Sequence, residues 1–244
     1  MNIELTNNRV VAIDGGAATG KGRLIDELSR LLRLKGVPVV HLSSGHLYRA
    51  VTWLALGRAG KPDPREAADW VKEHMEAAEL VGLAQEHGVE MHGGLVWIDG
   101  AAADVDGQLK APGVGLAISH VSGFLAVREL ANELIRRQVN EFDGYVLIDG
   151  RDITHTVVPD ALLKLLLVVH PRVAAERSPE HTEEELVARD AADRAHAHGA
   201  LRHPDDPGEG VRVLATDNHT PESVRDEVYA MMREVWPELP EIDG

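Results

Sequence analysis

The stretch from Val10 to Leu24, which reads VVAIDGGAATGKGRL, constrains the fold of this chain more than any other stretch. An aliphatic run ends in an acid, a glycine-rich turn follows, and an amphipathic pattern then begins, which is typical of a strand, a loop and a helix. Gly15, Gly20 and Lys21 stand at the GxxxxGK spacing of a phosphate-binding loop. In such a loop the backbone N–H groups and the helix N-terminus together form a site for an anion. The sequence therefore predicts a phosphate site at the carboxyl end of a buried strand.

The loop departs from the usual pattern after its lysine. A Ser or Thr hydroxyl is expected at one of the next two positions, where this chain has Gly22 and Arg23. Arg23 could clamp a phosphate through charge-assisted hydrogen bonds, or it could point outward from the first turn of the helix. Lys21 is expected to reach the β- and γ-phosphates of a nucleotide. The residues expected at the nucleotide's phosphates are Gly15, Gly16, Ala17, Ala18, Thr19, Gly20, Lys21, Gly22 and Arg23.

Short aliphatic runs alternate with helical patterns along most of the chain, which is typical of βαβ units and of a parallel sheet. The expected strands are residues 10–14, 37–42, 145–149, 162–169 and 211–216. The expected helices are residues 21–34, about 126–142 and about 183–197. We therefore expect an α/β fold with a central, parallel, five-stranded sheet flanked by helices.

The segment from about residue 62 to residue 117 interrupts this pattern. It is rich in glycine, alanine and charge, and its GVEMHGGLVWIDG stretch predicts a hairpin that turns at Gly93 and Gly94. We expect residues 62–117 to form a small inserted subdomain, and residues 1–61 and 118–244 to form the core of the fold.

The composition narrows the classes of partner. A net charge of −15 argues against general nucleic-acid binding, which needs a basic surface. An acidic protein can still bind small anions where a few cations are focused in one cleft. Because the chain has no cysteine, disulfides, thiolate metal sites and a cysteine nucleophile are excluded. With no leader or membrane span in view, we expect a cytoplasmic protein without a membrane partner, and slightly favour a monomer.

A second stretch, HLSSGHLYRA, places polar groups directly after an expected strand. Ser44, Tyr48 and Arg49 could jointly grip a second phosphate, although Tyr-Arg pairs also occur on ordinary helix surfaces. Together with the loop the stretch gains meaning, because phosphoryl transfer needs an acceptor site that faces the donor site.

A third stretch, YVLIDGRDITHTVVPDA, ends another strand in charged residues. Ligands of open α/β sheets bind at the carboxyl ends of the strands, where Asp149, Arg151 and Asp152 are expected to lie. Asp149 could hold Mg²⁺ or its waters, and Arg151 could face a phosphate. The alternative is a salt-bridged turn without a ligand.

With these three stretches the chain resembles the bacterial cytidylate (CMP) kinases, a family of P-loop nucleoside-monophosphate kinases. The family's IDGPSGAGKGT-like, SGxLYR and GRDMGTVVFPDA-like stretches stand here as IDGGAATGKGR, SSGHLYRA and GRDITHTVVPDA. AISHVSGFLAVRELANELIRRQ and EELVARDAADRAHA resemble two further family segments in the same order. The resemblance covers about residues 9–50 and 117–235, and it implies the P-loop kinase fold with a short lid over about residues 171–200.

The resemblance implies a role for each matched residue. ATP with Mg²⁺ would be the phosphate donor, and Asp149 would hold the Mg²⁺ indirectly. The residues implied in catalysis are Lys21, Asp149, Arg151, Arg172 and Arg177. The residues implied in acceptor binding are Ser44, Tyr48, Arg49, Ser119, Arg128, Arg151, Asp152, Arg189 and Asp193. Of these, Ser119, Arg128 and Asp152 would read the cytosine edge, and the Asp152 carboxylate would favour the N4 amine of cytosine over the carbonyl of uracil.

Several positions depart from the family pattern. Thr154 and His155 stand where Gly-Thr is common, and His196 stands where many members have Arg. The part of the lid over about residues 171–184 is short and offers Arg172 and Arg177, where the family often has a denser arginine cluster, and a thinned lid could mean a slow enzyme. The implied ribose residues, Arg189 and Asp193, also have the i,i+4 spacing of a plain surface ion pair.

We therefore expect an enzyme that transfers the γ-phosphate of ATP to CMP or dCMP. One alternative is a related kinase with another acceptor, such as a modified nucleotide or a small alcohol. A second alternative is a nucleotide-binding protein with little turnover. Arg23 and the sparse lid motivate the second, and the THTVV stretch with His196 motivates the first.

Overall fold

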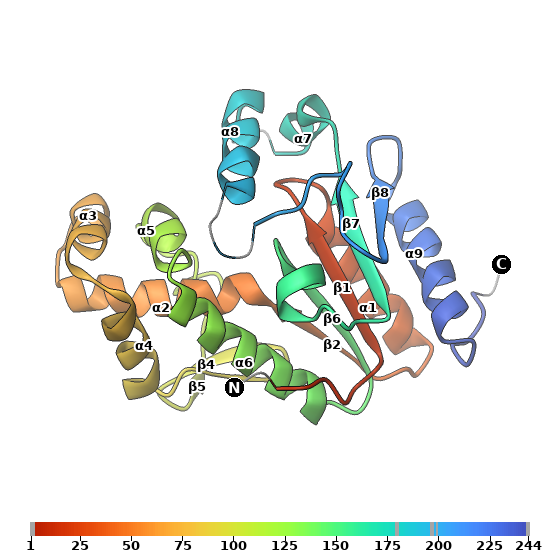
Figure 1. Ribbon diagram of the computed structural model, residues 1–244, viewed down its shortest axis with the longest axis horizontal. Coiled ribbons are helices and arrows are strands. Elements are labelled where there is room, and N and C mark those ends of the chain that lie inside the picture. Colours follow the sequence, from red (N-terminus) through yellow and green to blue (C-terminus); the bar gives the residue numbers. More distant parts are fainter. Residues whose placement is uncertain (1–2, 179–180, 196–197, 199, 243–244) are drawn as a thin grey trace. The chain divides into compact units, whose positions relative to one another are not determined.

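The computed structural model describes residues 3–178, 181–195, 198 and 200–242. The chain divides into two compact units. The first unit comprises Met1–Glu4 and Leu42–Glu141, and the second comprises Leu5–His41 and Phe142–Gly244. Figure 1 labels most of the helices and strands of both.

The second unit is built on a five-stranded sheet in the order β2-β6-β1-β7-β8 (Figure 1). β1 pairs in parallel with β6 and with β7, and β7 pairs in parallel with β8. The strands are β1 (Val10–Gly15), β2 (Val39–Ser43), whose last two residues belong to the first unit, β6 (Tyr145–Gly150), β7 (Leu163–Val168) and β8 (Val211–Ala215). Every residue of β1 is buried, as expected for a central strand that is covered on both faces. The predicted α/β fold with a central five-stranded sheet is confirmed.

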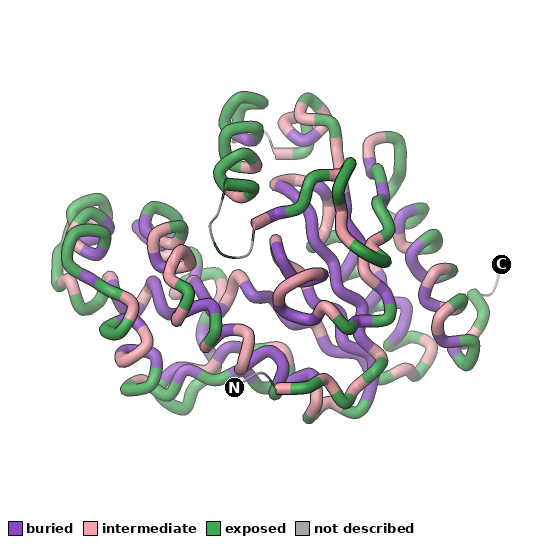
Figure 2. The backbone as a smooth tube through the Cα atoms, viewed as in Figure 1, coloured by how far each residue is buried: buried purple, intermediate pink, exposed green. Residues whose placement is uncertain are grey.

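Helices cover this sheet. The helical segments of the second unit are α1 (Lys21–Leu34), the π-helical turn η1 (Ile153–Val157), α7 (Pro171–Arg177), α8 (Glu183–Arg194) and α9 (Pro221–Val235). α1 and α9 pack against each other and against the sheet. Their apolar faces join the strands in one core, which Figure 2 shows as buried backbone. α8 begins with a capping box, in which Thr182 Oγ1 accepts from the N–H of Glu185 at 3.2 Å and the Glu185 carboxylate accepts from the N–H of Thr182 at 2.9 Å.

The first unit is mainly helical. Its elements are α2 (Ser44–Ala59), α3 (Pro64–His74), α4 (Ala77–Glu86), β3 (Glu90–His92), β4 (Leu95–Ile98), β5 (Ala101–Ala102), α5 (Val114–Val121) and α6 (Leu125–Glu141). The three strands form an antiparallel sheet, and Gly93 and Gly94 turn the chain between β3 and β4 with φ of 58° and 82°. The predicted hairpin is thus confirmed. Residues 62–117 lie wholly within this unit, and their role as an inserted subdomain remains a proposal.

In the described part of the chain, no single helix has the length and apolar character of a membrane span. The helices α5 and α6 meet those criteria only as a pair, and the chain bends by 96° between them.

Candidate active site

The loop between β1 and α1 has a backbone suited to an anion. Gly20 has a φ of 91°, a left-handed conformation that glycine adopts without strain. Ala18 has a φ of 54°, and such conformations in residues other than glycine are found at functional sites. α1 begins at Lys21, so its unpaired N–H groups and the positive end of its dipole meet the loop.

Lys21 folds back over this loop. Its Nζ donates hydrogen bonds to the carbonyl oxygens of Gly15 at 2.5 Å and of Gly16 at 2.8 Å. Burial lowers the pKa of Lys21 to about 7, the Arg151 guanidinium lowers it as well, and nearby carboxylates act in the opposite direction. An anion bound at the loop would favour the charged form of this lysine.

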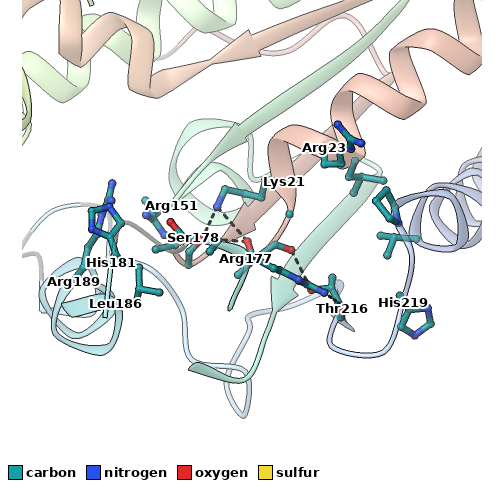
Figure 3. Close-up of a pocket in the computed structure, with 18 residues that line it drawn as sticks. Lys21, Arg23, Arg151, Arg177, Ser178, His181, Leu186, Arg189, Thr216 and His219 are labelled. Atoms are coloured by element: carbon teal, nitrogen blue, oxygen red, sulfur yellow. Dashed lines mark hydrogen bonds between the residues drawn. The ribbon is translucent and has the colours of Figure 1, made fainter. Parts of the chain in front are cut away.

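A cavity of about 610 Å³ opens over the loop (Figure 3). The loop forms one part of its lining, and side chains of α1, α8, α9 and the segments next to them form the rest. The cationic side chains that line it are Lys21, Arg23, Arg151, Arg177 and Arg189. A chain with a net charge of −15 thus concentrates positive charge in one cavity, which is the arrangement that binds small polyanions.

Arg151 is held between the loop and α8. Its guanidinium donates to the carbonyl oxygen of Gly15 at 2.7 Å and lies 3.1 Å from the carboxylate of Asp193. The Asp190 carboxylate is 3.7 Å away. Arg151 is therefore already oriented toward the loop by fixed partners, as a residue that meets a phosphate at this place needs to be.

The side chain of Asp190, a residue of α8, contacts the loop directly. Its Oδ1 accepts a hydrogen bond from the N–H of Ala17 at 2.9 Å. The close approach requires glycine at residue 16, because a Cβ there would overlap the Asp190 carboxylate. A carboxylate of α8 thus uses a loop N–H that could otherwise bind a phosphate oxygen.

A second carboxylate, that of Asp14, is buried under the loop. It accepts hydrogen bonds from the N–H groups of Ile153 and Thr154 and from the Thr154 hydroxyl. Burial raises the pKa of Asp14 to about 6, the hydrogen bonds from Thr154 and Ile153 oppose that rise, and the Asp152 carboxylate adds to it. Asp14 is therefore mainly ionised at pH 7 and becomes neutral in mildly acidic solution.

Asp149, the last residue but one of β6, lies beside a histidine of the neighbouring strand. Its Oδ1 lies 2.8 Å from Nε2 of His41, and its side chain is 19% exposed. The carboxylate is thus oriented by a partner and still reaches solvent, which suits a group that binds the water shell of Mg²⁺.

The two lid arginines lie in different surroundings. Arg177 donates to the hydroxyl of Thr216 at 2.9 Å and to its carbonyl oxygen at 2.5 Å, and the same hydroxyl donates to the carbonyl oxygen of Thr19 at 3.1 Å. Arg177 is thereby linked to the loop and lines the cavity. Arg172 is 75% exposed, pairs with Glu176 at 3.8 Å and is not among the cavity's described lining residues.

The predicted acceptor residues fall on both units. In the first unit the Arg128 guanidinium lies over the ring of Tyr48, 5.3 Å from its centroid, and both side chains are buried. Arg49 donates to the carbonyl oxygen of Leu109 at 3.1 Å. Ser44 is buried at the first turn of α2, and Ser119 is exposed on α5.

In the second unit, Arg151 and Asp193 are paired and Asp152 is 1% exposed at the start of η1. Arg189 is exposed on α8 and lines the cavity. The alternative interpretation of Arg189 and Asp193 as an i,i+4 ion pair has no counterpart among the ion pairs of the described residues, where Asp193 pairs with Arg151. His196 lies outside the described residues.

Comparison with known proteins decides which family this site belongs to. The family model for cytidylate kinase matches residues 11–234. The chain belongs to the cytidylate kinase family. The predicted family is therefore confirmed, and with it the class of enzyme, a nucleotide kinase of the phosphotransferases.

Two individual cytidylate kinases are similar to this chain over most of their length. The cytidylate kinase of Chloroherpeton thalassium is 31% identical over 96% of this chain and 97% of its own. That of Streptomyces griseus is 33% identical over 81% of this chain and 82% of its own. A bifunctional pantoate ligase/cytidylate kinase of a Synechococcus species is 31% identical over 96% of this chain, which spans 47% of that longer protein. Among solved structures, thymidylate kinase from Candida albicans has 12% identity and a TM-score of 0.45, over 98% of this chain and 96% of its own.

Sequence reasoning missed three polar groups of this site. Asp14 reads as the end of a strand, and no local pattern marks Thr154 as its partner. Asp190 stands beside Arg189 in the RDAADR stretch, and the signal in the sequence for its contact is Gly16, which leaves room for a side chain against the loop. The sequence around His41 shows only that it lies in a strand. Its pairing with Asp149 depends on β2 and β6 being neighbours in the sheet.

Proposed function

We propose that this cytidylate kinase family member transfers the γ-phosphoryl group of ATP to CMP or dCMP, giving ADP and CDP or dCDP. One observation carries the proposal: Lys21 and four arginines surround a cavity over a phosphate-binding loop. Transfer between phosphates needs little covalent chemistry from the protein, so positioning and charge stabilisation account for most of the catalysis.

The donor would bind with its phosphates on the loop. The loop N–H groups and the end of α1 are suited to the phosphate oxygens, and Lys21 is within reach of them because its Nζ lies on the carbonyl oxygens of the same loop. Arg151 and Arg177 would stabilise the charge that develops on the transferring group. Arg23, the replacement for a hydroxyl, lines the same cavity, which supports a role as an additional phosphate contact.

We propose Mg²⁺ as the cofactor of the donor. The Asp149 carboxylate, held by His41 and partly exposed, fits the oxygen chemistry that Mg²⁺ requires. When bound, Mg²⁺ would neutralise charge on the phosphates.

The acceptor would be recognised through three sets of groups. Ser44, Tyr48 and Arg49 are suited to its phosphate, together with Arg151. Arg128, Asp152 and Ser119 are proposed to read the cytosine, with the Asp152 carboxylate accepting from its amine. Arg189 and Asp193 are proposed for the ribose, and the pairing of Asp193 with Arg151 supports a place for Asp193 near the reacting phosphates.

In this proposal the protein acts as a monomer on free nucleotides in the cytoplasm, where both substrates are found, without nucleic acid or membrane. The net charge of −15 supports a small anion in a cleft over a nucleic-acid partner. The comparisons do not favour the alternatives of another acceptor or of a protein with little turnover.

The proposal is tested by measuring ADP release from MgATP with CMP, dCMP, UMP, AMP and small alcohols as acceptors. We expect kcat/KM to be highest for CMP or dCMP. Equal or higher values for another acceptor would contradict the proposed substrate. We further expect Lys21→Ala to lower kcat by about a hundredfold or more, since it removes a positive charge that stabilises the transferring phosphoryl group.

A matched control is Lys61→Ala, which removes an exposed lysine from the first unit and should leave the kinetics unchanged. Circular dichroism and thermal melting of both variants would show that the fold is retained. A folded Lys21→Ala enzyme with nearly normal kcat would refute the assignment of the phosphate-binding loop.

A further inference from the structure

The carboxylate of Asp14 is a buried charge of the second unit that accepts three hydrogen bonds. Asp14 directly precedes the loop, at the end of β1, and is 1% exposed. One of its oxygens accepts from the N–H of Ile153 at 2.8 Å. The other accepts from the N–H of Thr154 at 2.9 Å and from the hydroxyl of Thr154 at 2.7 Å. Three donors from a segment 139 and 140 residues away thus converge on one side chain.

Only one of these three bonds depends on a side chain. The two N–H groups belong to the first turn of η1, where they have no partner within the turn, and almost any residue could supply them. The hydroxyl is particular to Thr154, which is 2% exposed and stands at a departure from the family pattern. A valine at this position would keep the shape and remove the hydrogen bond.

A second link joins the same two segments. Arg151, three residues before Thr154, donates to the carbonyl oxygen of Gly15, the residue after Asp14, at 2.7 Å. The start of the loop and the turn after β6 are therefore joined at two adjacent places. Arg151 belongs to the proposed site, whereas the Thr154 hydroxyl donates to Asp14, a group that is not proposed to touch a nucleotide.

The geometry points to Thr154 as a positioning residue for phosphoryl transfer. Its hydroxyl bonds Asp14 and thereby holds the start of the phosphate-binding loop against the turn after β6, which contains Arg151. This role rests on the proposed function. A displacement of about 1 Å between reacting groups can lower a rate by up to about a hundredfold, so a single buried bond at this junction can matter for kcat.

The charge states of Asp14 and Lys21 are linked. Burial and the Asp152 carboxylate raise the pKa of Asp14, and the hydrogen bonds from Thr154 and Ile153 lower it. Burial and Arg151 lower the pKa of Lys21, and the ionised Asp14 raises it, as do Asp149 and Asp190. On its other side β1 meets β7, where Leu166 is the partner of Asp14. Loss of the Thr154 hydroxyl would therefore favour a neutral Asp14 and a less charged Lys21.

The test compares Thr154→Val, Thr154→Ser and Thr156→Val with the wild-type protein. Thr156 lies in the same turn, and the described hydrogen bonds to the Asp14 carboxylate come from Ile153 and Thr154. Steady-state kinetics give kcat and the KM for ATP and CMP, and a carbon-13 NMR titration of the Asp14 carboxyl reports the link without any turnover.

We expect Thr154→Val to lower kcat about tenfold while both KM values stay within about twofold of wild type. The titration midpoint of Asp14 should move above the wild-type value of about 6. Thr154→Ser should restore both quantities, and Thr156→Val should change neither.

Three results would overturn the inference. These are an unchanged midpoint and kcat in Thr154→Val, a Thr154→Ser enzyme as impaired as Thr154→Val, or a change in KM alone. If Thr154→Val does not fold, the serine variant and its titration decide between the hydroxyl and the methyl group. A wild-type protein without kinase activity would instead contradict the proposed function, and the titrations would still decide whether Thr154 controls Asp14.

Discussion

Lys21 shows, at the scale of a single residue, how burial and charge oppose each other in this site. Its ammonium lies on two carbonyl oxygens beneath the cavity, and burial brings its pKa to about 7. The spacing of the loop predicted this lysine and its place. The further lowering of this pKa by the Arg151 charge could not be predicted from the loop, because Arg151 comes from a segment about 130 residues away and its place depends on how β1 and β6 pair.

A pH dependence follows for the donor. Near pH 7 a fraction of Lys21 is neutral in the free protein, and phosphate binding favours the charged form, so ATP should bind with proton uptake. We expect the dissociation constant of ATP to rise as the pH increases from 7 to 9, and calorimetry in buffers of different ionisation enthalpy to report uptake of up to about one proton. The same constant at pH 7 and pH 9, with no proton uptake, would contradict this account of Lys21.

At the scale of elements, the periodicity of the sequence was sufficient to predict the bounds of a helix or strand where its burial follows a simple pattern. The helix predicted at 21–34 is α1, with the same bounds, and β1 and β6 differ from the predicted strands by one residue at the end. The charged helix predicted at about 183–197 is α8, which ends at Arg194. The long-range contacts of α8 could not be predicted from the sequence, since hydrophobic periodicity does not indicate which acid of a charged helix contacts the loop.

The contact of α8 with the loop leads to a prediction for ATP binding. Asp190 occupies the N–H of Ala17, so a nucleotide phosphate that uses this N–H must displace it. We expect Asp190→Asn to lower the dissociation constant of ATP by about two- to tenfold, because it removes a negative charge and a charge-assisted hydrogen bond from the loop. Calorimetric titration with ATP measures the change.

The control for this variant is Asp160→Asn, which removes an exposed acid from the loop before β7. It should leave ATP binding unchanged. Weaker ATP binding by Asp190→Asn would show that Asp190 helps the donor to bind instead of competing with it.

At the scale of the whole molecule, the charges buried in the site lower the free energy of unfolding, and the packing of the core must offset this loss. The folded-state pKa of Lys21 is lowered from 10.5 to about 7, so its contribution to stability is present above about pH 10.5 and is lost as the pH falls toward 7. The folded-state pKa of Asp14 is raised from 3.8 to about 6, so its contribution is present below 3.8 and is lost as the pH rises through 6. Between pH 6 and 7 both charges are buried at a cost in stability.

This cost predicts that loss of function and gain of stability go together. We expect Lys21→Met to raise the melting temperature at pH 7 by about 2–4 °C, which corresponds to about 1 kcal/mol for a chain of this size. The gain should shrink as the pH approaches 10, and Lys61→Met should show no gain. A Lys21→Met protein that melts below the wild type at pH 7 would show that the two carbonyl contacts of the ammonium outweigh its burial.

The transfer of a phosphoryl group from ATP to CMP is the central claim, and the fate of the γ-phosphate tests it most directly. The purified full chain is mixed with Mg²⁺, CMP and ATP labelled at the γ-phosphate, and the products are separated. We predict that the label appears in CDP, at its β-phosphate, and that little appears as inorganic phosphate. Label that remains in ATP, or that is released only as inorganic phosphate, would contradict the account.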